Sequence, residues 1–359
     1  MNNPMPEEQS NIELLEKRLC ASWPAIRKAH ADTTGRRRDL NKLFSDRNSP
    51  DTSVVVFGSI ARNEVTSSSD LDWILLVDGS AVPEHKSQER DVERALAEGN
   101  YIEPGKSGVF GKMVGSHDLV HNIGGEDDLN SNTTRRVLLL LESLPISNRE
   151  AYDRVRRQIL RRYLEDDRGL LYAGGEVRIP RFLLNDLTRY WRTITVDFVY
   201  KQRSDNDKKW ALRNAKLRMS RKLVFAAGLL HCFFCHLDAD ASLAREALRS
   251  FDLSPLTAYL ETQLANAPLD VVAKACLNLR ISEATSRALF DSYDRFLGIL
   301  DHPEKRAELA RAQTHEDLRS SKAWDEVREV SRPFHEALIA LFLKDDEDLK
   351  SLTLEYGVF

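Results

Sequence analysis

Residues 54–78 read VVVFGSIARNEVTSSSDLDWILLVD and contain the most informative pattern in the chain. Residues 54–57 form an apolar, β-branched run that ends at Gly58, and residues 71–77 form a second apolar run that ends at Asp78 and Gly79. Apolar runs bounded by turn residues are typical of buried strands. The sequence therefore predicts two buried strands joined by a short, turn-rich segment.

Two carboxylates stand where the second predicted strand opens. Because side chains alternate between the two faces of a strand, Asp70 and Asp72 are predicted to project from one face, while Leu71 and Trp73 pack on the other. Paired carboxylates are the hard oxygen ligands that Mg²⁺ prefers, together with waters and the phosphate oxygens of a substrate. We therefore predict that Asp70 and Asp72 bind Mg²⁺, with Mn²⁺ as the alternative.

The end of the first predicted strand supplies a complementary feature. Gly58 has no Cβ and lets a phosphate approach the backbone, and Ser59 with the following amides can donate hydrogen bonds at a helix N-terminus. Two metal ions about 3.5 to 4 Å apart can activate an attacking hydroxyl and stabilise a departing pyrophosphate in an in-line displacement. The two strand ends together indicate nucleotidyl transfer.

This stretch resembles the signature of the DNA polymerase β-like nucleotidyltransferase superfamily, in which a Gly-Ser pair precedes acidic-x-acidic on a strand. The residues that match are Gly58, Ser59, Asp70 and Asp72, and Arg62 and Ser69 match the commoner form of the motif. The resemblance implies an enzyme that moves an NMP group from an NTP to an acceptor hydroxyl and releases pyrophosphate. It also implies that Arg62 and Ser69 help Gly58 and Ser59 to bind the nucleotide.

The superfamily usually adds a third carboxylate from a later strand, in an apolar-Asp-apolar-apolar context. Asp118, in the sequence HDLV, fits best and would complete the metal site and help deprotonate the acceptor hydroxyl. Asp127 and Asp128 compete for this role. A surface carboxylate, or the partner of a nearby arginine, is the alternative interpretation of Asp118.

The chain of 359 residues has the length of roughly two domains, and its character changes near residue 144. Residues 1–144 mix strand and helix patterns and are predicted to form the catalytic domain with N-terminal helices. Residues 145–345 are predicted to form a helical domain that closes the nucleotide cleft, and residues 346–359 a poorly ordered acidic tail. The predicted fold class is α+β, with a small mixed sheet followed by helices. The predicted helices cover residues 151–164, 181–201, 210–237, 241–249, 256–265, 271–279, 283–300 and 320–343.

A local basic block, KKWALRNAKLRMSRK at residues 208–222, lies on a predicted helix of the second domain. Lys216 and Arg221 are our candidates to hold the triphosphate or the phosphates of an acceptor. The alternative is a solvated basic face whose apolar side packs into the core. The following stretch HCFFCH, residues 231–236, contains a Cys-x-x-Cys-His pattern, but its apolar surroundings favour a buried helical turn.

Composition limits the function further. The chain carries 30% charged and 42% hydrophobic residues with a formal net charge of −4, which is typical of a soluble globular protein. No apolar run approaches the roughly 20 residues of a membrane span, and the N-terminus lacks a secretory pattern, so a cytoplasmic location is expected. The net charge disfavours a long nucleic acid as acceptor, although the basic block keeps a local contact open.

The acceptor is therefore predicted to be an unidentified protein or small molecule. The layout and the stretch RRVLLLLES at residues 135–143 resemble stand-alone relatives of the PII uridylyltransferases. Two alternatives stay open: a cyclic (oligo)nucleotide synthase of the antiphage type, and a catalytically silent nucleotide-binding module. The nucleobase and the oligomeric state cannot be predicted.

Overall fold

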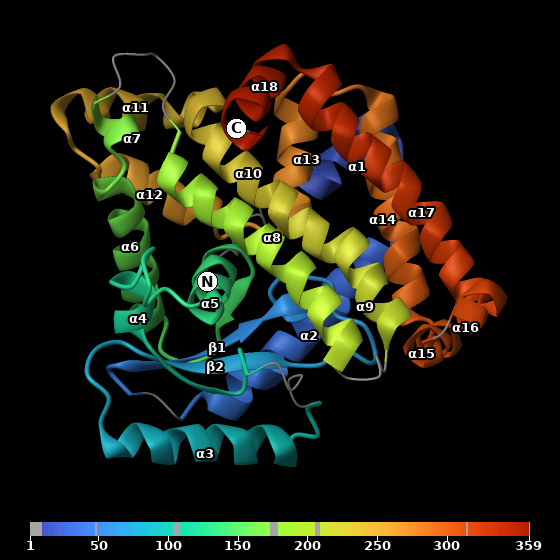
Figure 1. The fold of residues 1–359 in the computed structure, drawn as a ribbon, viewed down its shortest axis with the longest axis horizontal. Helices are drawn as coiled ribbons and strands as arrows, with labels where there is room; N and C mark the ends of the chain where they lie inside the picture. Colours follow the sequence, from blue (N-terminus) through green and yellow to red (C-terminus); the bar gives the residue numbers. More distant parts are fainter. Residues whose placement is uncertain are drawn as a thin grey trace, which may run out of the picture.

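A small sheet and a large assembly of helices make up the molecule (Figure 1). The computed structural model describes residues 9–46, 49–102, 108–172, 179–204, 209–313 and 315–358. The sheet has four strands and is mixed, which confirms the predicted α+β class. Its strands are β1 (Thr52–Phe57), β2 (Asp72–Val77), β3 (Lys112–Gly115) and β4 (Ser143–Pro145).

The strands lie in the order β3-β2-β1-β4. β1 pairs antiparallel with both β2 and β4, and β2 pairs parallel with β3. Phe57, the last residue of β1, lies opposite Asp72, the first residue of β2. The end of β1 that leads into Gly58 and the acidic start of β2 therefore meet at one edge of the sheet.

Helices cover both faces of the sheet, so that all six residues of β1 are buried. On one face, Val56 and Leu75 pack with α2 (Pro24–Phe44) and α3 (Pro83–Glu98). On the other face, Val55 and Ile74 join the main core of the molecule together with α4 (Ser116–Val120), α5 (Asn130–Leu141) and α6 (Arg149–Glu165). A strand covered on both sides needs apolar residues at every position, which explains the uninterrupted run in the sequence.

The rest of the chain is helical, in agreement with the sequence pattern. The main core extends without a break from the sheet through these helices. They are α7 (Arg168–Tyr172), α8 (Arg181–Ser204), α9 (Trp210–Lys216), α10 (Lys222–Leu237), α11 (Ser242–Ala247), α12 (Ser254–Gln263), α13 (Pro268–Asn278), α14 (Glu283–Asp301), α15 (Pro303–Arg311), α16 (His315–Ser320), α17 (Lys322–Ala340) and α18 (Glu347–Leu352). The N-terminal helix α1 (Asn11–Leu19) packs on α13, and α2 packs on α14.

The chain after residue 345 corrects one prediction. Instead of a poorly ordered acidic tail, it forms α18 and the π-helix Thr353–Val358. Leu349 and Leu352 are buried in the main core, and Asp346 caps α18 by accepting a hydrogen bond from the Leu349 amide. Two buried leucines and a cap stabilise this segment despite its acidic character. The predicted boundary near residue 144 falls within β4.

Helix α10 passes through the interior of the molecule, and twelve of its sixteen residues are buried, including Cys232 and Cys235. The predicted buried turn at residues 231–236 is confirmed for its first five residues. Among the described residues, no single helix has the length and apolar composition to cross a membrane; one bent pair, Trp210–Leu237 with Ala239–Ser250, passes by length and composition only.

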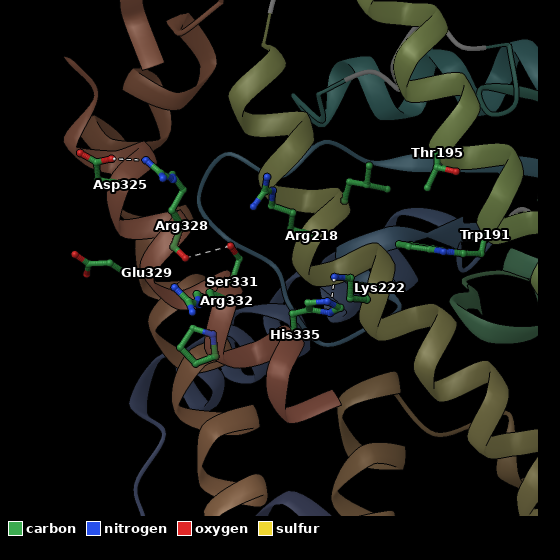
Figure 2. Close-up of a pocket in the computed structure, with 12 residues that line it drawn as sticks. Trp191, Thr195, Arg218, Lys222, Asp325, Arg328, Glu329, Ser331, Arg332 and His335 are labelled. Carbon is green, nitrogen blue, oxygen red and sulfur yellow. Dashed lines mark hydrogen bonds and ion pairs between the residues drawn. The ribbon is translucent and has the colours of Figure 1, made fainter. Parts of the chain in front are cut away.

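A groove of about 970 Å³ opens between α8 and α17 (Figure 2). The start of α10 and the residues just before it form its floor. We call it the α8/α17 groove, and the side chains that define it include Trp191, Arg218, Lys222, Arg328, Arg332 and His335.

Candidate active site

Gly58 and Asp72 lie against each other at the edge of the sheet. Gly58 has a φ of +75°, a left-handed conformation that favours glycine. A Cβ built on Gly58 would lie 3.5 Å from Oδ2 of Asp72. The backbone of the turn therefore passes close to the carboxylate, and the missing side chain keeps that approach open.

The turn after β1 is held by its own hydrogen bonds and by a helix behind it. The amides of Ala61 and Arg62 both donate to the Gly58 carbonyl at 3.0 Å. Arg37 of α2 donates to the carbonyls of Ile60 and Ala61, each at 3.0 Å. Half-buried Ser59 forms no side-chain hydrogen bond within the part of the chain that the structure describes. Its hydroxyl can therefore still donate to a phosphate.

Asp70 and Asp72 are brought together as predicted, although Asp70 precedes the strand rather than opening it. Burial and the neighbouring charge of Asp70 raise the pKa of Asp72 to about 6. Burial alone would raise the pKa of Asp70 too, but Lys216, Arg306 and Arg221 outweigh it and hold that pKa below its ordinary value. The two carboxylates thus repel each other inside a ring of cations.

Three cations from the helical part of the chain form this ring. Lys216, the last residue of α9, places Nζ 3.6 Å from Oδ1 of Asp70. Arg221 ends the π-helical segment Leu217–Arg221, and its positive charge favours the ionised form of both aspartates. Arg306 of α15 acts on Asp70 and also donates to Oγ1 of Thr66 at 3.3 Å. The candidate site therefore combines the sheet edge with α9, the π-helical segment and α15.

The π-helical segment explains how Lys216 and Arg221 serve one site. An α-helix turns about 100° per residue, so residues five apart would point about 140° away from each other. A π-helix closes its turns between residues i and i+5, which brings such a pair to the same side. π-helical turns occur frequently at functional sites for this reason.

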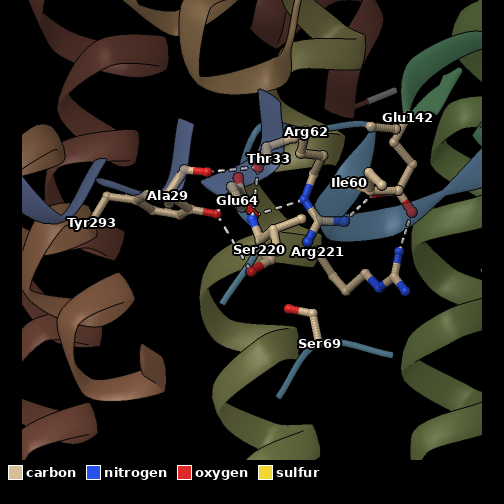
Figure 3. A network of polar contacts seen from close by, with 12 residues as sticks. Ala29, Thr33, Ile60, Arg62, Glu64, Ser69, Glu142, Ser220, Arg221 and Tyr293 are labelled. Carbon is tan, nitrogen blue, oxygen red and sulfur yellow. Dashed lines mark hydrogen bonds and ion pairs between the residues drawn. The ribbon is translucent and has the colours of Figure 1, made fainter. Parts of the chain in front are cut away.

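Glu142 connects the cations to the sheet (Figure 3). This residue lies between α5 and β4, its side chain is fully buried, and it forms ion pairs with both Arg62 and Arg221. Arg62 also pairs with Glu64 at 2.8 Å, and Glu64 accepts a hydrogen bond from the hydroxyl of Tyr293 on α14 at 2.7 Å. A single buried network thus joins β4, the turn after β1, the π-helical segment and α14.

Two residues predicted to bind nucleotide lie in structural positions instead. Arg62 is buried, and both of its carboxylate partners belong to the network around Glu142, so its guanidinium holds the turn in place. Ser69 is also buried, and its hydroxyl accepts a hydrogen bond from the Thr66 amide at 3.0 Å. That bond closes the loop before Asp70. The predicted role in direct nucleotide binding is not supported for Arg62 or Ser69.

The structure does not bring Asp118, the predicted third carboxylate, to the Asp70 and Asp72 pair. Asp118 is exposed on helix α4, which follows β3, and it accepts a hydrogen bond from Asn122 at 3.2 Å. Because β3 runs parallel to β2, α4 begins beside the end of β2, and Asp72 lies at its start. The six residues of β2 are joined by five steps of about 3.3 Å, so its two ends lie about 17 Å apart.

Asp127 and Asp128 do not fill this role either. Asp128 is buried in ion pairs with Arg136, at 3.0 Å, and Arg189, and Asp127 is exposed. Both precede α5, whose twelve residues extend about 18 Å to Glu142 at the other end. They are therefore far from the sheet edge that carries Asp70 and Asp72.

The donor chemistry of the pair fits a hard divalent cation. Asp70 and Asp72 supply carboxylate oxygens, and a cation between them would relieve the repulsion that raises the pKa of Asp72. No cluster of three or more His, Cys, Asp or Glu side chains suited to a metal occurs within the residues described. Water and phosphate oxygens would complete the coordination of a cation held by Asp70 and Asp72, as is usual for Mg²⁺.

Sequence reasoning missed Glu142, Arg306 and Arg37. Glu142 interrupts the apolar run RRVLLLLES, and a lone carboxylate beside such a run is a usable signal, since it needs a buried partner. The residues around Arg306, PEKRAELAR, are typical of an exposed helix and offer no such signal.

Of the two lysines that open the basic block, Lys209 is exposed, and Lys208 lies outside the described residues.

A mixed sheet that presents two carboxylates beside a Gly-Ser turn defines the nucleotidyltransferase class of site. Residues 37–107 match the family model of the nucleotidyltransferase domain, and this confirms the resemblance to the DNA polymerase β-like superfamily. The matched region includes Gly58, Ser59, Asp70 and Asp72. A search of curated proteins found no match to the chain. The family match supports a transferase enzyme that uses a nucleoside triphosphate.

Proposed function

We propose that this protein is a Mg²⁺-dependent nucleotidyltransferase that moves an NMP group from an NTP to a hydroxyl of a protein or small-molecule acceptor and releases pyrophosphate. The observation that carries the proposal is the meeting of Asp70 and Asp72 with the Gly58 turn and with three cations. Mn²⁺ can replace Mg²⁺ in such a site, because both accept carboxylate oxygens.

In this proposal Asp70 and Asp72 hold the metal, which when bound neutralises phosphate charge and polarises the reacting phosphoryl group. The turn at Gly58 lets the triphosphate approach its backbone, and the Ser59 hydroxyl donates a hydrogen bond to it.

Lys216, Arg221 and Arg306 balance the charge that builds up as pyrophosphate departs. Arg221 is prepared for this task because Glu142 holds its guanidinium in place, so little reorganisation is needed when substrate binds. Lys216 contacts Asp70 in the substrate-free arrangement and would exchange that contact for a phosphate.

The experiment is release of pyrophosphate from each of the four NTPs with Mg²⁺. It compares the wild type with the double variant Asp70→Asn, Asp72→Asn, and Asp118→Asn serves as a matched control that removes a carboxylate about 17 Å away. We expect release by the wild type and by Asp118→Asn only. Equal release by the double variant would contradict the proposal.

Labelled NTPs then distinguish the acceptor. Label on a protein or a small acceptor supports the proposed reaction, whereas a phosphatase-resistant product made from NTP alone indicates a cyclic nucleotide synthase. Binding of NTP without any turnover indicates the silent nucleotide-binding module.

A further inference from the structure

The α8/α17 groove lies outside the candidate active site and has the size of a ligand pocket. Its volume of about 970 Å³ is at the upper end of the usual range of about 300 to 1,000 Å³ for small-molecule sites. Neither Lys216 nor Arg221 lines it, although their helical neighbours Leu217 and Lys222 do. The groove therefore lies on a different side of the π-helical segment and its flanking residues from the side that faces Asp70 and Asp72.

The groove is basic in a chain whose net charge is negative. Four Lys and Arg side chains line it against two carboxylates, Asp325 and Glu329. Two of the four basic side chains already have carboxylate partners: Arg328 is 3.6 Å from Asp325, and Arg332 is 2.9 Å from Glu336. The other two, Arg218 and Lys222, pair with no carboxylate within the part of the chain that the structure describes.

The described contacts of Arg218 and Lys222 include no carboxylate, and the guanidinium of Arg218 also lies 5.6 Å from the centroid of the Trp324 ring. Arg218 donates to Oδ1 of Asn214 at 2.6 Å, a neutral acceptor, and Lys222 places Nζ 3.3 Å from Nδ1 of His335 (Figure 2). Burial and the charge of Arg218 lower the pKa of Lys222. Burial and the charge of Lys222 likewise lower the pKa of His335. An anion in the groove would relieve these repulsions.

An aromatic side chain lies on the α8 side of the groove. Trp191 stacks on Phe225, with ring centroids 5.3 Å apart and an interplanar angle of 13°. This stacking holds the half-buried indole in a fixed orientation as part of the groove wall. Flat rings stack favourably on such an indole, so the groove combines a ring platform with paired cations.

We propose that the α8/α17 groove binds a nucleotide, with its phosphates on Arg218 and Lys222 and its base against Trp191, at a site distinct from that of Asp70 and Asp72. The nucleotide in the groove is either a ligand that does not react or the acceptor of the transferred NMP group. The acceptor role rests on the proposed function, whereas binding in the groove does not.

The test is isothermal titration of ATP and of inorganic triphosphate in the presence of EDTA, which removes the divalent cations that the candidate active site would use. We compare the wild type with the double variant Arg218→Ala, Lys222→Ala and with the single variant Trp191→Ala. Lys216→Ala instead reports binding at the candidate active site, because it removes the cation that contacts Asp70. The double variant Arg157→Ala, Arg161→Ala removes two exposed charges of α6 and controls for net charge.

We expect the Arg218 and Lys222 double variant to bind ATP at least about tenfold more weakly, since two charge-assisted contacts to the phosphates are lost. Trp191→Ala should weaken ATP binding but not triphosphate binding. The double variant Arg157→Ala, Arg161→Ala should bind as the wild type does. If Lys216→Ala abolishes ATP binding while the Arg218 and Lys222 double variant retains it, ATP occupies the candidate active site and the proposal is wrong.

Addition of Mg²⁺ and a labelled second NTP distinguishes the two roles. A labelled product that contains the unlabelled nucleotide, and that the double variant no longer forms, identifies the groove nucleotide as the acceptor. Recovery of that nucleotide unchanged identifies it as a ligand that does not react. Because the binding assay contains no metal, failure of the proposed catalytic function would leave its result unchanged.

Discussion

Replacing Glu142 with glutamine provides the most direct test of the buried network. The substitution keeps the size and shape of the side chain and removes its charge. Arg62 retains Glu64 at 2.8 Å, but Arg221 has no other carboxylate within ion-pair distance among the described residues. The variant therefore leaves one guanidinium, whose side chain is only 29% exposed, without its counter-charge.

The expected loss of stability follows from this geometry. Removing one partner of a buried ion pair costs about 3 to 5 kcal/mol because the other charge stays buried and uncompensated. Since Arg221 reaches some solvent, we expect the lower end, about 3 kcal/mol. A chain of this length has an unfolding entropy that converts this loss to a fall in Tm of about 4 °C.

Thermal and urea unfolding, followed by circular dichroism, measure the loss. Glu165→Gln is the control, because it breaks the exposed pair with Arg161 and should cost less than about 0.5 kcal/mol. A loss for Glu142→Gln no greater than that of the control would refute the reasoning. The cations that flank Glu142 hold its pKa below its ordinary value against the effect of burial. The Glu142 charge therefore contributes its full stability above the pKa of an unfolded glutamate. This contribution is lost as the pH falls through the pKa of Glu142 in the folded protein, so wild type and Glu142→Gln should have similar stabilities in acid.

Four further predictions concern the site itself. The pKa of Asp72, about 6, lies above that of an unfolded aspartate, so its neutral form stabilises the fold below about pH 4 and this effect is lost as the pH rises through 6. Asp72→Asn should therefore have a higher Tm than wild type at pH 8 but not at pH 4, and no turnover. Lys216→Met should raise KM for the NTP about tenfold or more in steady-state assays, since one charge-assisted contact is lost. Gly58→Ala should lower Tm by about 1 to 3 °C through its left-handed φ and abolish pyrophosphate release by filling the approach to Asp72. Asp118→Asn should leave kcat and KM unchanged, and a large loss of either would return Asp118 to the site.

The parts of the site that sequence reasoning predicted are local. The two apolar runs, the glycine between them and the Asp70 and Asp72 pair depend on neighbours within a few residues, so periodicity is sufficient to place them. Lys216 was also found, because a basic block in an acidic chain is conspicuous. The buried pairing of Arg62 was not predicted because its partner Glu142 lies 80 positions away in sequence, and no local pattern reveals such a pair.

The third carboxylate shows why local reasoning fails at longer range. Asp118 follows the short strand β3, but whether such a residue reaches Asp72 depends on the direction in which β3 pairs. In this parallel arrangement, the residues beside Asp72 are those that lead into β3, and Gly111 donates its amide to the Trp73 carbonyl there. A pattern of residue types does not contain strand direction, so it cannot place Asp118 relative to the two ends of β2.

The π-helical segment combines the two basic sites into one piece of architecture. In an unbroken α-helix, Lys216 and Arg221 would diverge by about 140°, and so would Leu217 and Lys222. The i to i+5 turn aligns the first pair toward Asp70 and Glu142 and the second pair along the α8/α17 groove. A ligand that binds Lys222 therefore contacts the same turn that positions Arg221. We therefore expect a nucleotide that shifts this turn from the groove to alter turnover at the candidate active site, because Arg221 would move with the turn.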